Sequence, residues 1–95
     1  MSTRIEGLQD AIELGHNCRA EHIRSVPLVE RLGEQTVWEG VVEVFELVGH
    51  AQAKCCFAWS YEKDGIRHSV AVLQLPPVTS PNTAIRAAVA SGQQK

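Results

Sequence analysis

The residues of this chain that could coordinate a metal lie close together in the stretch "ELGHNCRAEH". His16, Cys18 and His22 carry the nitrogen and sulfur donors that zinc prefers, and Glu13 precedes His16 by three positions, a spacing found in di-iron helical bundles. Structural zinc sites usually join two paired motifs, and di-iron sites use two such helices, whereas this chain has one copy of each pattern. We therefore interpret the stretch as a polar connection between a helix and a strand, and predict neither a metal nor another cofactor.

A second group of side chains could support thiol chemistry. Cys55 or Cys56 could act as a nucleophile with His50 or His68 as its base, provided that the base lies within hydrogen-bonding reach and the pKa of the thiol is lowered. Cysteines in the middle of a strand are more often small buried apolar residues, and no third residue stands at a spacing that would orient the base. We assign no catalytic residue.

The stretch "LQLPPVTSPNTAIRAAVASG" contains a helix start that could attract an anion. Thr79, Thr83 and Arg86 surround the free amides that are expected after Ser80. No glycine-rich loop precedes this helix to let a phosphate approach the backbone. Ser80 as N-cap and Pro81 at the first helical position are explained by capping alone. The stretch therefore predicts a connection between a sheet and a helix rather than a ligand site.

Aromatic residues supply the best candidate binding surface. Trp38, Phe57, Trp59 and Tyr61 fall on adjacent predicted strands, where they would form one cluster. Such a cluster is most often part of the core. If it lies on the sheet face away from the helices, it would anchor a dimer interface or line an apolar pocket. The candidate interface or pocket residues are Trp38, Val42, Phe45, Phe57, Trp59, Tyr61, His50 and His68.

The elements that must position these residues begin and end with a helix. Thr3 and Glu6 form a capping-box pattern, an apolar stripe follows at helical spacing, and Gly15 is the expected end of this helix. The second helix is expected from Ser80 to Gly92. The stripe of the first helix consists of Ile5, Leu8, Ala11 and Ile12, and that of the second of Ala84, Ile85, Ala88 and Val89.

Between the helices, the pattern predicts three or four antiparallel strands within residues 22–33, 35–49, 54–61 and 66–75. Pro27 places the first of them at a sheet edge, and Asp64-Gly65 indicates a tight hairpin turn. The predicted order is α-β-β-β-β-α. It is typical of an α+β domain, in which a meander of 3-4 strands forms the sheet and the N-terminal and C-terminal helices pack on one face of it.

Both faces of the longest strand are apolar. Val41 and Phe45 lie on one face, whereas Trp38, Val42 and Val44 lie on the other. Because two short helices are expected to cover only one face, the other face would meet a second copy of the chain or line a cavity. We predict a non-enzymatic, homodimeric interaction module that uses this helix-free face. The alternative is a small-molecule-binding protein or minor enzyme with a pocket for a small apolar or cationic ligand, gated by His50 or His68.

Composition limits the other possibilities. The 95 residues suit a single domain, and 44% of them are hydrophobic, enough to form a core. The net charge of −2 gives no electrostatic reason to expect binding to a nucleic acid or an anionic membrane. No stretch is long and apolar enough to span a bilayer, and Glu6, Asp10 and Glu13 interrupt the region where a signal peptide would be apolar. We therefore expect a cytoplasmic protein whose three cysteines are reduced.

The words "TVWEGVVEVFELVGH", "AKCCFAWS" and "LQLPPVTSPNTAIRAAV" lie within residues 35–90. They resemble a group of short uncharacterised bacterial proteins associated with mobile elements such as integron cassettes. The resemblance implies a bacterial cytosolic protein that forms a self-contained domain, but it implies no activity and no functional residue. The order of elements also resembles the double-stranded-RNA-binding domain. That domain places basic residues at the start of its last helix, where this chain has Ser80, Pro81, Asn82 and Thr83, so RNA binding is not expected.

Overall fold

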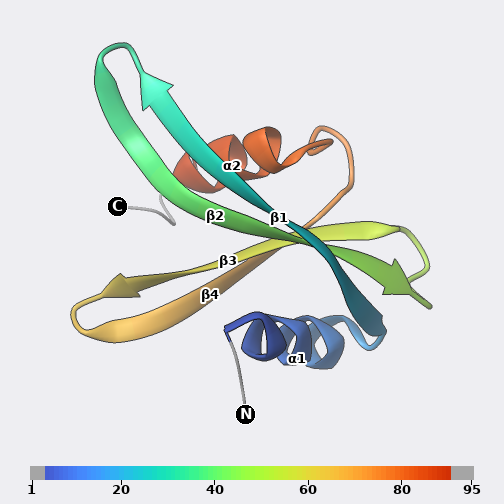
Figure 1. Ribbon diagram of the computed structural model, residues 1–95. Helices are drawn as coiled ribbons and strands as arrows, with labels where there is room; N and C mark the ends of the chain where they lie inside the picture. The colour runs from blue at the N-terminus through green and yellow to red at the C-terminus, as the bar shows by residue number, and fades with distance from the viewer. Residues whose placement is uncertain (1–3, 91–95) are drawn as a thin grey trace.

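A computed structural model describes residues 4–90 of the chain. Its elements follow in the order α-β-β-β-β-α, which confirms the predicted α+β class and the meander of antiparallel strands (Figure 1). The bounds of the elements are α1 Arg4–His16, β1 Arg19–Leu32, β2 Gln35–Val48, β3 Cys55–Lys63, β4 Ile66–Leu73 and α2 Pro81–Ala90.

The ends of the helices follow from local chemistry. Helix α1 continues one residue past Gly15, and it stops where Asn17 adopts a left-handed conformation with φ of 52°. Helix α2 begins after a reciprocal cap, in which the amide of Ser80 donates to Thr83 Oγ1 at 2.9 Å and the amide of Thr83 donates to Ser80 Oγ at 3.3 Å. The predicted cap at Thr3 and the predicted end at Gly92 lie outside the described residues.

The four strands form one sheet in the order β1-β2-β3-β4. Strand β1 is therefore at an edge, as Pro27 predicts, and β4 is at the other edge. The β3–β4 turn contains Asp64 with φ of 57° and Gly65 with φ of 77°, which confirms the tight turn predicted from this pair. The β1–β2 turn uses Gly33 with φ of 64° in the same way.

The central pair of strands is joined over a short distance only. The β2–β3 ladder runs from Glu43 opposite Ala58 to Glu46 opposite Cys55, whereas β1 and β2 pair along almost their whole lengths. Beyond Glu43 and Ala58 the two hairpins diverge and form the two arms on the left of Figure 1. Residues 35–42 of β2 and 59–63 of β3 therefore have no partner strand on the edges that face each other.

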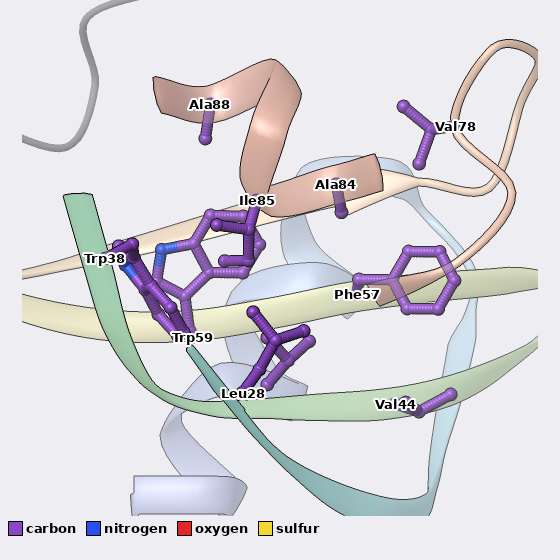
Figure 2. Packing of buried hydrophobic residues seen from close by; sticks show 10 residues of the cluster. Leu28, Trp38, Val44, Phe57, Trp59, Val78, Ala84, Ile85 and Ala88 are labelled. Atoms are coloured by element: carbon purple, nitrogen blue, oxygen red, sulfur yellow. The ribbon is translucent and has the colours of Figure 1, made fainter. Parts of the chain in front are cut away.

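The helices pack on opposite faces of the sheet, so the prediction that they share one face is wrong (Figure 1). Alternate residues of each strand point to opposite faces of the sheet. On β2, Val42 and Val44 belong to the core on the α2 side, whereas Phe45 and Leu47 belong to the core on the α1 side. Because both faces are apolar, each one binds a helix. The α2-side core, most of which Figure 2 shows, contains Leu28, Trp38, Val42, Val44, Phe57, Trp59, Val78, Ala84, Ile85 and Ala88. The α1-side core contains Leu8, Ile12, Ala20, Phe45, Leu47, Ala53, Cys56 and Ala58.

Helix α1 is fixed to the sheet at the outer edge of β1. The side-chain amide of Gln9 donates to the carbonyl of Ala20 at 2.6 Å, and the amide of Ala20 donates to Glu13 Oε2 at 2.9 Å. These bonds satisfy both backbone groups of an edge residue that would otherwise lack a protein partner. Within residues 4–90, no helix has the length and apolar character needed to cross a membrane.

Candidate functional site

The point where the two hairpins separate forms a cleft, which we name the interhairpin slot. Its volume is about 360 Å³. Residues from β2, β3 and α1 line it: Leu8, Trp38, Glu39, Gly40, Val41, Glu43, Trp59, Ser60 and Tyr61. The lining includes neighbouring residues of β2 and of β3 whose side chains point to opposite faces of the sheet. The slot therefore lies between the two strands, where their ladder has ended.

The walls of the slot present backbone peptide groups. The amide of Leu47 donates to the carbonyl of Lys54 at 2.8 Å, so odd-numbered residues of this part of β2 direct their peptide groups toward β3. By the same alternation, Val41 directs its peptide group into the slot from β2, and Ser60 does so from β3. The ladder stops at Glu43 and Ala58, so these two peptide groups do not pair across the sheet. A ligand with polar atoms could bind to either wall.

Two tryptophans form the aromatic part of the slot. The rings of Trp38 and Trp59 meet edge to face, with centroids 6.0 Å apart and an interplanar angle of 72°, and lie together beneath α2 in Figure 2. Trp59 is 1% exposed, and its Nε1 atom is the one buried side-chain nitrogen or oxygen of the described residues that has no hydrogen-bond partner. A buried N–H without an acceptor is costly for the folded protein.

Gly40 fixes the position of the Trp38 ring. A Cβ atom added at Gly40 would lie 2.9 Å from Cη2 and 3.2 Å from Cζ2 of Trp38. The indole therefore extends along β2 and covers the glycine two residues further on. Any larger residue at this position would displace one wall of the slot.

Carboxylates form the polar part of the slot. Glu43 is 1% exposed, and its Oε1 lies 2.9 Å from His22 Nε2 and accepts a hydrogen bond from the hydroxyl of Ser25. These bonds compensate for the burial of the carboxylate. Glu39 is exposed and lies on the same face of β2 as Glu43. The lining contains these two carboxylates and no Lys or Arg, so it favours a cationic ligand over an anionic one.

The structure distributes the eight candidate residues over several places. Trp38, Trp59 and Tyr61 line the slot. Val42 and Phe57 belong to the α2-side core together with the two tryptophans, and Phe45 belongs to the α1-side core on the opposite face. Trp38, Phe57 and Trp59 share the α2 side of the sheet, but the eight residues do not form one site.

The two candidate histidines are not themselves part of the slot lining. His50 Nδ1 accepts hydrogen bonds from the amides of Gln52 at 3.1 Å and Ala53 at 2.9 Å, so it stabilises the β2–β3 connection. His68 is exposed and stacks on Tyr61, with centroids 5.2 Å apart and an interplanar angle of 19°. His68 therefore contacts the slot through Tyr61, whereas His50 belongs to the loop between β2 and β3.

Sequence reasoning missed the acidic and backbone parts of the slot. Glu39 and Glu43 stand inside a strand that is apolar on both faces, and that contrast is the signal that could have identified them. The partners of Glu43 come from β1, at sequence separations of 21 and 18 residues, so no local pattern indicates them.

Of the three cysteines, Cys56 has the properties of a core residue. Cys56 is 0% exposed, and burial, followed by the nearby Cys18 thiol, raises the pKa of Cys56 from its ordinary value of 9.0 to about 12. A thiol with this pKa is not a nucleophile at neutral pH. Among residues 4–90, no three His, Cys, Asp or Glu side chains gather closely enough to hold a metal ion. His16 instead lies 5.9 Å from the ring of His50, and His22 contacts Glu43.

Comparison of the chain with protein-family models, with curated proteins and with solved structures found no match.

Proposed function

We propose that this protein is a small-molecule-binding module that holds an organic cation with an apolar or aromatic body in the interhairpin slot. The observation that carries the proposal is the combination of aromatic rings and carboxylates in one cleft. Trp38 and Trp59 supply the rings, and Glu39 supplies an exposed carboxylate beside the buried Glu43. Aromatic rings attract cations by about 0.5–2 kcal/mol, and carboxylates add a Coulombic attraction.

The size and polar groups of the slot support this ligand class. Its volume of about 360 Å³ lies within the range that small-molecule sites usually occupy. The peptide groups of Val41 and Ser60 would orient a ligand that also carries an acceptor or a donor. Apolar contact with Leu8 would cover its body.

Of two further expectations from the sequence, this proposal drops one and keeps the other. An interaction module that uses a helix-free sheet face is not part of it, because each face of the sheet carries one helix. A cytoplasmic location remains part of it, supported by three free cysteines that fit a reducing compartment.

Intrinsic fluorescence tests the proposal, because both tryptophans of the chain line the slot. We would titrate the protein with pairs of ligands of equal shape, one cationic and one neutral, such as phenyltrimethylammonium and tert-butylbenzene. We expect the cation to bind about tenfold more tightly than its neutral partner, which corresponds to about 1.4 kcal/mol.

Charge variants localise the binding. Glu39→Gln should remove most of the preference for the cation, whereas Glu34→Gln, which makes the same charge change at the exposed β1–β2 turn, should keep it. Equal affinity for both ligands of a pair, or an equal response of the two variants, would refute the proposal.

A further inference from the structure

The outer edge of β4 has no partner strand. Residues 69–73 of this strand line a groove of about 640 Å³ together with His16 and Tyr61. Ser69 and Ala71, in the middle of the strand, are exposed. An edge strand of this kind presents unpaired backbone groups to any strand that approaches it.

The direction of these backbone groups follows from the ladder with β3. The amide of Gln74 donates to the carbonyl of Cys55 at 2.9 Å, so even-numbered residues of β4 direct their peptide groups toward β3. The two-residue turn between Lys63 and Ile66 agrees with this assignment, because the residues that flank such a turn bond to each other, so Ile66 also directs its peptide group toward β3. Arg67, Ser69 and Ala71 therefore direct their peptide groups outward.

The other edge of the sheet is protected against pairing. Strand β1 has register shifts between His22 and Arg24 and between Glu30 and Arg31, and it contains Pro27. Helix α1 occupies its backbone at Ala20. Prolines, bulges and covering elements are the usual means of preventing edge-to-edge association. Strand β4 has a continuous register with β3 and contains no proline. It therefore lacks the bulges and the proline that protect β1 against pairing with another strand.

We propose that β4 pairs with β4 of a second copy of this chain, antiparallel and around a two-fold axis at Ser69, so that the two sheets join into one. In this register Ser69 faces Ser69 of the second copy, and Arg67 faces Ala71 of the second copy. All outward peptide groups named above are then paired, with about six hydrogen bonds across the axis.

The side chains support a second copy of the chain rather than an unrelated peptide. Ile66, which is 60% exposed, comes to lie beside Val72 of the second copy on the same face, so both gain apolar contact. The antiparallel register keeps Arg67 of one copy away from Arg67 of the other, so no like charges face each other. A strand that matches itself without a charge conflict favours an isologous dimer.

Proline substitution at the axis tests the interface without disturbing the β3–β4 ladder. Ser69→Pro removes an outward N–H that does not bond to β3, whereas Ser69→Ala keeps it. By sedimentation equilibrium we expect the wild type and Ser69→Ala to be dimers at about 50 µM and the dissociation constant of Ser69→Pro to rise at least about tenfold. Far-ultraviolet circular dichroism checks that Ser69→Pro is folded. A monomeric wild type, or a folded Ser69→Pro variant that dimerises as tightly as Ser69→Ala, would overturn the proposal.

Disulfide crosslinking provides a test that does not require a destabilising variant. Directly opposed residues of a hydrogen-bonded antiparallel pair have Cα atoms about 5.5 Å apart, which a disulfide can bridge. With Cys18 and Cys55 replaced by Ser, Ser69→Cys should form a covalent dimer under mild oxidation. Thr36→Cys, at an exposed position of β2, should not. Equal crosslinking of the two variants, or none at position 69, would overturn the assigned register.

Discussion

Replacing Gly40 by alanine should displace Trp38 and destabilise the protein. The added Cβ would lie 2.9 Å from Cη2 of Trp38, closer than such atoms approach, and the ring cannot simply swing away because it is packed against Trp59 in the α2-side core. Overpacking of this kind costs about 1–3 kcal/mol. The reduced backbone entropy of the unfolded chain offsets about 0.4–1 kcal/mol, because Gly40 does not have a positive φ. We therefore expect a net loss of about 1 kcal/mol.

Urea unfolding monitored by circular dichroism measures this loss, and thermal unfolding should show a fall in Tm of about 4–8 °C. Gly7→Ala is the matched control. It makes the same chemical change inside helix α1, where an added Cβ meets no atom within 4 Å, and it should stabilise the protein by up to about 1 kcal/mol.

A double-mutant cycle identifies the cause. In a Trp38→Leu background, Gly40→Ala should no longer be destabilising, because the atoms that it contacts have been removed. The reasoning is refuted if Gly40→Ala is as stable as the wild type and leaves the tryptophan emission spectrum unchanged. The same holds if its effect persists in the Trp38→Leu background.

Two further predictions concern the cores. Because the pKa of Cys56 is raised from 9.0 to about 12 in the folded protein, its stabilising contribution is complete below pH 9.0 and is lost as the pH rises through about 12. Urea unfolding between these values should show a loss of about 1.4 kcal/mol per pH unit that is absent in Cys56→Ala. Ile12→Ala and Ile85→Ala should each destabilise the protein by about 2–5 kcal/mol. Their effects should add within about 0.5 kcal/mol in the double variant, because the two residues lie in separate cores on opposite faces. A large interaction energy would contradict that separation.

Local sequence signals predicted most of the elements but not their arrangement. The cap at Ser80 and Pro81, the turn at Asp64 and Gly65, and the edge position of the strand with Pro27 were all predicted correctly. Each of these signals acts within a few residues, so it is visible in the sequence. The end of α1 was missed by one residue because Asn17, rather than Gly15, takes the left-handed conformation.

The candidate site could be predicted only in part. Trp38, Trp59 and Tyr61 were identified because aromatic residues on strands are conspicuous in any sequence. The slot that they line depends on the point where β2 and β3 separate, and nothing in the sequence near Glu43 or Ala58 indicates that the ladder stops there. The point of separation depends on how the two hairpins pack against the helices on the two faces of the sheet.

The sequence alone determined that the central strands are apolar on both faces, because alternation along a strand fixes which residues share a face. Only the tertiary structure decided what covers those faces. Helix α1 takes one and α2 takes the other, since each apolar face excludes water best by binding its own helix. The same arrangement leaves the split between the two hairpins and the outer edge of β4 uncovered by a partner strand.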